Sequence, residues 1–180
     1  MKSIKIIPLG EVDTDLLSWL GRELRRIFDT DVSISTYVME PPSVAYNTRR
    51  RQYLSTLILG NLKSTYKDRN INVLLVTELD LYVPGLNFVF GQAESPGNYA
   101  IVSLHRLRPE FYGEKNDLKL LAERLLKEAV HELGHTYGLR HCLNPRCVMR
   151  FSNSILEVDA KSCGFCDTCI AELSKLNRYS

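Results

Sequence analysis

Three histidines at a fixed spacing limit the structures open to the C-terminal third of this 180-residue chain. His131 and His135 are four residues apart, about one helical turn, so both imidazoles can reach one cation from the same face of a helix. Gly138 can end that helix in the left-handed conformation, after which the chain can bring back a third imidazole from His141. Three imidazoles leave one open position on a tetrahedral ion, as in a catalytic zinc site. The pattern therefore predicts a helix that ends near residue 138 beside a metal centre.

Glu132 follows the first of these histidines in the pattern His-Glu-x-x-His-x-x-Gly-x-x-His. Its carboxylate projects from the same helical turn, where it can accept a proton from a water held by the cation. A lone histidine such as His105 is more simply structural, but three in register with a glutamate and a glycine favour a metal site. Zinc suits imidazole ligands with one open position, although the ligand types alone also allow cobalt or nickel.

All five cysteines lie in the C-terminal third of the chain. Cys142 and Cys147 form one closely spaced pair, and Cys166 and Cys169 form a second, so four thiolates could close a tetrahedral structural zinc. Cys163 has the same spacing to Cys166 as Cys166 has to Cys169, and the spacing alone leaves this choice open. Disulfides are the alternative, which a reducing compartment disfavours.

Met149 comes shortly after the third histidine. A methionine most often fills a gap in a core. At this position we expect instead a tight turn that places an apolar floor beneath the imidazoles.

The rest of the chain predicts an α/β scaffold. Apolar and β-branched runs predict strands at residues 3–9, 32–39, 72–77, 87–90 and 99–107. Apolar residues at helical spacing predict helices at residues 14–28, 47–66, 117–139 and 167–176. This order implies a mixed sheet with helices packed on it. We expect an N-terminal subdomain of residues 1–138, with the sheet and the histidine helix, and a C-terminal subdomain of residues 139–180.

The charge and the length of the apolar runs exclude other classes of protein. Runs such as residues 73–76 are far shorter than the ~20 residues needed to cross a bilayer. A formal net charge of +2 gives no strong field for nucleic acid, and few basic residues lie among aromatics near the cysteines, which argues against a zinc-ribbon-like nucleic-acid module. The first residues are typical of a strand rather than of a signal peptide. We therefore expect a cytoplasmic monomer that binds neither nucleic acid nor membrane.

The segment 131–142, followed by residues 147–149 and 166–169, resembles the signature of the archaemetzincins, a family in the metzincin clan of zinc peptidases. The resemblance implies two zinc ions per chain, one catalytic and one structural. The residues it implicates are the catalytic zinc ligands His131, His135 and His141, the general base Glu132, the Met-turn residue Met149, and the structural zinc ligands Cys142, Cys147, Cys166 and Cys169. It also implies a twisted mixed sheet with an antiparallel edge strand, packed helices that include an active-site helix, and a small C-terminal subdomain stabilised by zinc.

The function that follows is hydrolysis of peptide bonds in a peptide or protein substrate, by a zinc-held water that Glu132 activates. The stretch Asn87, Phe88, Val89 and Phe90 is similar to the family's edge strand over the cleft, so we expect it to pair with the substrate backbone. The alternative is a non-catalytic, zinc-dependent peptide-binding protein.

Phe151 marks a difference from some metzincins, which place a tyrosine two residues after the Met-turn methionine. Because Phe151 cannot donate a hydrogen bond, zinc itself, Tyr112 or Tyr137 would have to stabilise the oxyanion.

Overall fold

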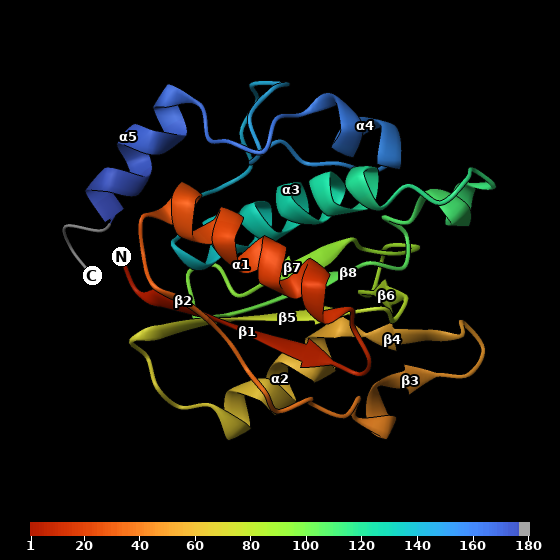
Figure 1. Cartoon of the computed structure of the whole chain (residues 1–180). Helices are drawn as coiled ribbons and strands as arrows, with labels where there is room; N and C mark the ends of the chain where they lie inside the picture. The colour runs from red at the N-terminus through yellow and green to blue at the C-terminus, as the bar shows by residue number, and fades with distance from the viewer. Residues whose placement is uncertain (177–180) are drawn as a thin grey trace.

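A five-stranded sheet lies at the centre of the computed structural model, which describes residues 1–176. The strands in spatial order are β2 (Val32–Ile34), β1 (Ser3–Leu9), β5 (Ile71–Thr77), β8 (Tyr99–Ser103) and β7 (Gly91–Ala93). Neighbours are parallel from β2 to β8, and β7 runs antiparallel to β8 at one edge (Figure 1). The predicted mixed sheet with an antiparallel edge strand is therefore confirmed.

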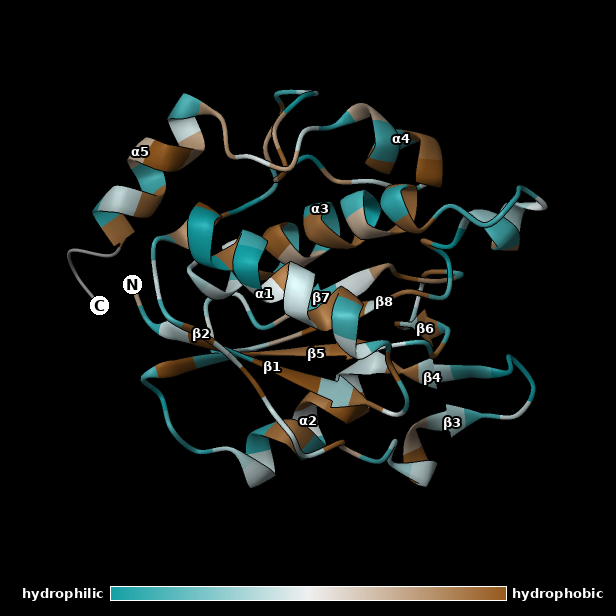
Figure 2. Ribbon diagram, viewed as in Figure 1, coloured by the Kyte–Doolittle hydropathy of each residue, from teal (hydrophilic) through white to brown (hydrophobic). Residues whose placement is uncertain are grey.

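Helices cover both faces of this sheet. The helices on the sheet are α1 (Thr14–Phe28), α2 (Ser55–Thr65) and α3 (Leu118–Thr136), whereas α4 (Ile155–Ala160) and α5 (Asp167–Leu176) lie farther from the sheet, beyond α1 and α3. Short 3-10 turns occur at Ser43–Ala45 and Pro109–Tyr112. Figure 1 shows α1 and α3 on one face and α2 on the other. Strand β5 serves both cores, because Leu74 and Val76 join the one that contains α1 and α3, and Val73 and Leu75 join the one beneath α2. The hydrophobic colouring of β1 and β5 in Figure 2 agrees with the predicted strand buried on both faces.

The sequence predicts both ends of the two helices on the upper face well. Asp13 caps α1 by accepting a hydrogen bond of 2.8 Å from the Leu16 amide, and Asp117 caps α3 by accepting one of 2.9 Å from Leu120. The α3 helix ends at Thr136, and Gly138 has a φ of +96°, as the predicted left-handed stop requires.

The predicted helix at residues 47–66 is wrong in its first half. Residues before Ser55 instead form a hairpin of β3 (Tyr46–Asn47) and β4 (Gln52–Leu54), and β4 pairs with β6 (Leu81–Tyr82) in a second, three-stranded sheet. The turn of this hairpin holds Arg51 at a φ of +57°, which breaks the helical path. Helix α2 therefore begins only after the hairpin.

The predicted edge strand at residues 87–90 is also wrong, since the edge strand β7 begins at Gly91. The backbone before it is held by side chains rather than by a ladder. Arg50 donates to the carbonyl oxygens of Leu86 and Asn87 at 2.9 and 2.7 Å, and Val89 makes only an isolated bridge to Leu81. Residues 87–90 thus form an irregular segment that leads into the edge strand.

Two other strands are shorter than predicted. Strand β2 ends at Ile34, because the Ser35 hydroxyl accepts the Tyr37 amide at 3.1 Å and turns the chain, and Met39 meets Leu9 through a single bridge. Strand β8 ends at Ser103, whose hydroxyl accepts a hydrogen bond from the His105 amide at 3.1 Å.

In the described part of the chain, no helix is long and apolar enough to cross a membrane.

Candidate active site

Helix α3 presents His131 and His135 on one face, and the turn after it returns His141. The ring nitrogen atoms with which these three histidines could bind a metal all lie within 4.8 Å of one another. The Nδ1 atoms of His131 and His135 are each 2.8 Å from a backbone carbonyl oxygen, those of Val148 and Leu139. Because Nδ1–H donates to these carbonyls, each Nε2 lone pair is directed toward the centre of the cluster.

This donor set fits a tetrahedral divalent cation. The Nε2 atoms of His131 and His135 are 3.2 Å apart. Two imidazole lone pairs this close repel each other, whereas bonds of ~2.0–2.1 Å to a shared zinc would put two tetrahedral nitrogen ligands about 3.4 Å apart. Burial lowers the pKa of His131 well below its ordinary value and lowers those of His135 and His141 as well. The three imidazoles are therefore kept in the neutral form that binds a metal.

Met149 packs against α3 at Gly134, which lies between His131 and His135. Gly134 has no side chain, and a Cβ there would lie 2.5 Å from the Met149 sulfur. The carbonyl of Met149 also accepts the Cys142 amide at 2.9 Å, which ties the turn to the residue after the third histidine. The glycine is thus the space into which the methionine fits.

Glu132 is 5% exposed, and no hydrogen bond reaches its carboxylate from any residue in 1–176. Burial, followed by the charge of Glu128, raises the pKa of the Glu132 carboxyl well above its ordinary value. Gly91 at the start of β7 approaches it so closely that a Cβ on Gly91 would lie 2.7 Å from the Glu132 Oε1 atom. Sequence reasoning did not assign Gly91 to the site, although a glycine directly after an apolar run is a sign of close backbone approach.

A cavity of about 520 Å³ opens beside these residues. The wall toward the sheet comes from residues 86–93, so the predicted substrate segment of Asn87, Phe88, Val89 and Phe90 does line the cavity. The opposite wall comes from α3 and from residues 151–153, which follow the methionine turn. Tyr112 and Tyr137 do not line it; their hydroxyls donate to the carbonyls of Arg106 and Lys2 at 2.8 and 3.1 Å.

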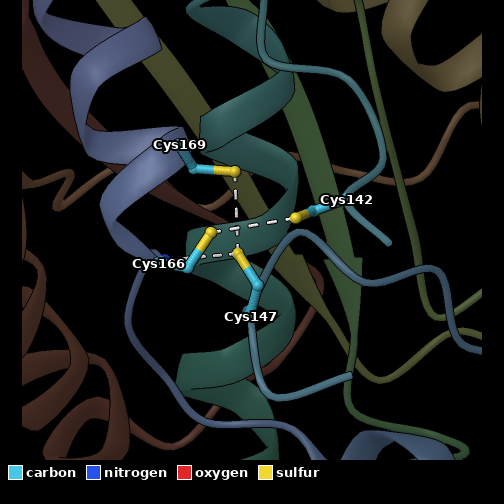
Figure 3. A group of neighbouring side chains, drawn as sticks. All are labelled: Cys142, Cys147, Cys166 and Cys169. Atoms are coloured by element: carbon cyan, nitrogen blue, oxygen red, sulfur yellow. Dashed lines mark hydrogen bonds between the residues drawn. The ribbon is translucent and has the colours of Figure 1, made fainter. Parts of the chain in front are cut away.

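Four cysteines form a second cluster above α3 (Figure 3). The sulfur atoms of Cys142 and Cys166 are 3.8 Å apart, those of Cys147 and Cys169 are 3.7 Å apart, and all four lie within 4.8 Å of one another. Zinc–sulfur bonds of ~2.3 Å in a tetrahedron would place the sulfurs about 3.8 Å apart. These cysteines are free thiols, and the exposed Cys163 lies outside the cluster.

The pKa of the Cys166 thiol lies below its ordinary value, whereas burial raises the pKa values of Cys147 and Cys169. The Cys169 backbone amide is the main cause, since its hydrogen bond to the sulfur lowers the pKa of Cys166 to about 7. The Cys166 amide in turn lies 3.4 Å from the Cys147 sulfur, and the Asn144 amide lies 3.4 Å from the Cys142 sulfur. Amides directed at sulfur stabilise thiolates, which are the form that ligates a metal.

Comparisons with known proteins agree with this geometry. The pattern of Peptidase family M54 matches residues 23–175. The chain is 47% identical to an archaemetzincin of Pyrococcus furiosus over 96% of this chain and 92% of that protein. It is 46% identical to an archaemetzincin of Methanocaldococcus jannaschii, over 98% and 95% of the two chains.

Solved structures give the same result. The crystal structure of archaemetzincin from Archaeoglobus fulgidus superposes with a TM-score of 0.81 at 40% identity, covering 94% of this chain and 99% of the other. A zinc-dependent peptidase from Methanocorpusculum labreanum superposes with a TM-score of 0.86 at 33% identity, with the same coverage of 94% and 99%.

Proposed function

We propose, from the premise that this chain belongs to peptidase family M54, that His131, His135 and His141 hold a catalytic zinc ion and that Glu132 is the general base. Membership of this family makes the chain a zinc-dependent metallopeptidase, and nothing in the comparisons favours a non-catalytic peptide binder. The observation that carries the residue assignment is the convergence of three imidazoles within 4.8 Å beside a buried, unpaired glutamate.

Zinc, when bound, supplies a Lewis acid that polarises the substrate carbonyl and makes water acidic enough to attack near neutral pH. Glu132 accepts the proton of the attacking water and returns it to the departing amine. Its burial suits both steps, because a carboxylate with a raised pKa binds a proton more firmly than an exposed one. Gly91 makes room for this side chain beside β7, because a Cβ at that position would lie 2.7 Å from the Glu132 Oε1 atom.

The edge of β7 binds the substrate backbone. On the side facing β8, the Phe90 carbonyl accepts a hydrogen bond from the Ser103 amide, and the Glu94 amide donates one to the Tyr99 carbonyl. Since backbone groups alternate along a strand, the amides and carbonyls of Gly91 and Ala93 point away from β8 and remain available to an extended peptide. The chain therefore takes a peptide or protein segment as an added strand along the cleft.

The four-cysteine cluster holds a second, structural zinc ion. Its support is the agreement between the sulfur separations in the structure and those of a zinc tetrahedron, together with amides that stabilise the thiolates. Four protein ligands leave no position for substrate, so this ion acts on folding rather than on catalysis. The monomeric state, the cytoplasmic location and the division at residue 138 stay predictions.

The test of this function combines metal analysis with peptide hydrolysis. Wild type should contain two zinc equivalents, and Glu132→Gln should keep both while losing about 10²–10⁴-fold in kcat/KM, the usual contribution of a general base. His135→Ala and Cys147→Ser should each retain one equivalent, because each removes a ligand from a different cluster. A wild-type chain with one equivalent, or a Glu132→Gln variant as active as wild type, would refute the assignment.

A further inference from the structure

The three histidines of the catalytic cluster are held in different ways. The imidazoles of His131 and His135 each donate from Nδ1 to a backbone carbonyl oxygen at 2.8 Å, which fixes the orientation of the ring. No hydrogen bond reaches the imidazole of His141 from any residue in 1–176, and this side chain is the most exposed of the three. The chain therefore needs a different kind of contact to orient its third ligand.

The ring of Phe151 packs against the imidazole of His141. Their centroids are 4.9 Å apart, with the two planes tilted by 43°, and both residues line the cavity. Aromatic rings at this separation attract each other beyond the effect of the area they bury. An imidazole that binds a metal also carries part of the positive charge of the ion, and an aromatic ring within about 6 Å attracts a positive charge. The contact should therefore be stronger when His141 holds the metal.

The backbone that carries Phe151 is fixed by a buried ion pair. The carbonyl of Arg150, the preceding residue, accepts a hydrogen bond from the Lys161 Nζ atom at 3.3 Å. Lys161 is 2% exposed, and its Nζ atom lies 2.8 Å from the Oε1 atom of Glu128, which is 3% exposed and belongs to α3. The amide of Arg150 donates to the carbonyl of Cys147 at 2.9 Å. The peptide groups before Phe151 are thus anchored to the helix that carries the other two ligands.

We propose, on the basis of the peptidase function above, that Phe151 is a positioning residue whose ring holds the His141 imidazole in the orientation that binds the catalytic zinc. It does for this ligand what a backbone carbonyl does for each of the other two. Without the ring, His141 has more rotamers to choose from, so binding the metal costs more conformational entropy. The role depends on the aromatic ring and needs no hydroxyl, which suits a phenylalanine two residues after the methionine.

Phe151 could instead contact the substrate or contribute only to packing, and a second aromatic pair offers a matched control. Phe111 is 43% exposed, close to the 41% of Phe151, and its ring centroid lies 5.3 Å from that of His105. His105 belongs to neither metal cluster. A packing role predicts the same consequences when either phenylalanine is replaced by leucine. A substrate contact predicts a higher KM for Phe151→Leu with unchanged zinc affinity.

The experiment measures zinc affinity by competition with a chelator, and the zinc held by the histidines is identified as the equivalent that His135→Ala lacks. Phe151→Leu should weaken this affinity by about tenfold, the lower end of the usual effect of losing a group that orients a ligand. Phe151→Tyr keeps the ring and should match wild type, as should Phe111→Leu. Equal zinc affinities in wild type and Phe151→Leu, or equal losses in Phe151→Leu and Phe111→Leu, would overturn the proposal.

Two further measurements separate this inference from the proposed function. With cobalt at the histidines, the visible absorption bands depend on ligand geometry, so they should change in Phe151→Leu and not in Phe111→Leu. In peptide hydrolysis by the zinc-loaded proteins, kcat should fall in Phe151→Leu while KM changes little. If wild type binds this zinc but cuts no peptide, and Phe151→Leu still loses affinity, the peptidase assignment fails and the positioning role stands. A raised KM with unchanged zinc affinity and cobalt spectrum would refute the positioning role and make Phe151 a substrate contact.

Discussion

Replacing Gly134 by alanine tests whether the methionine turn sets the position of the histidine helix. Gly134 lies on α3 between His131 and His135, the two zinc ligands proposed on this helix. An added Cβ would lie 2.5 Å from the Met149 sulfur, 3.2 Å from its methyl carbon and 3.2 Å from a ring carbon of Phe165. Met149 is 0% exposed, so its side chain has little room to move away. Either the helix or the turn must therefore shift.

Two opposing effects decide the size of the change. Overpacking a core by one methyl group typically costs about 1–3 kcal/mol. Alanine is favoured over glycine inside a helix by about 0.8–1.0 kcal/mol. The Gly134→Ala variant should therefore lose up to about 2 kcal/mol of unfolding free energy, which corresponds to a fall in Tm of up to roughly 8 °C for a chain of this size.

Gly60 provides a matched control because it lies inside α2 and a Cβ there would meet no atom within 4 Å. Gly60→Ala carries only the helix-propensity effect and should stabilise the chain by about 0.8–1.0 kcal/mol. Urea unfolding of the zinc-loaded proteins at one zinc concentration measures both changes. Because the shift in Gly134→Ala moves the ligands, kcat/KM should also fall in that variant and not in Gly60→Ala.

A double-mutant cycle identifies the contact responsible. Met149→Ala alone should destabilise by about 2–5 kcal/mol because it leaves a cavity. In the double variant the new methyl group of residue 134 has space, so the two changes should couple favourably by about 1–2 kcal/mol. Stabilisation of equal size in Gly134→Ala and Gly60→Ala, or a cycle without coupling, would refute the close packing of the turn against the helix.

Three further predictions concern the ligands, a tether and the edge strand. Zinc held by the histidines should stay bound at pH values below about 6.5, the ordinary pKa of histidine. Burial lowers the pKa values of His131, His135 and His141, so protons displace the metal only at a pH below those lowered values. Release of zinc with a midpoint at or above pH of about 6.5 in a chelator titration would contradict this. Asp159→Asn should lower the unfolding free energy by about 2 kcal/mol, because it weakens two hydrogen bonds from Arg124, which is 3% exposed. An unchanged midpoint of urea unfolding would show that this link between α3 and α4 does not stabilise the chain. Gly91→Ala should reduce kcat/KM by about 10²-fold while the zinc content stays intact. The added Cβ would lie 2.7 Å from both the Glu132 Oε1 atom and the Ile101 carbonyl oxygen, so Glu132 must move. Full activity in this variant would show that Glu132 can be displaced without loss of catalysis.

The parts of the site that the sequence predicts are those governed by local geometry. The spacing of His131 and His135 follows from the pitch of one helix, and Gly138 occupies the left-handed position that ends it. The four clustered cysteines are likewise two pairs of near neighbours in the chain, and the structure brings them together without Cys163. In each case, a few consecutive residues carry the information.

The parts that sequence reasoning missed depend on contacts between distant segments. The segment before Gly91 is irregular because Arg50 and Gln52, more than thirty residues earlier, bind its carbonyl oxygens. The helical spacing predicts a helix over those same two residues, although they belong to the hairpin of β3 and β4. Glu128 and Lys161 each resemble ordinary surface residues in the sequence, and only the folded chain pairs them at 2.8 Å in the interior. No local pattern distinguishes such residues from solvent-exposed ones.

The two metal clusters are linked by one short segment, residues 139–154, which contains no helix or strand. The carbonyl of Val148 accepts the imidazole of His131, while the amide of Val148 donates to Gly164 at 3.0 Å, close to the cysteines. One residue away, Cys147 itself belongs to the thiolate cluster. Because this segment lacks regular structure, its position depends on the cysteine cluster on one side and on α3 on the other. On the proposed assignment, a zinc held by these thiolates would orient His131 through two peptide groups, so a change in the cysteine cluster should alter catalysis without contacting the cleft.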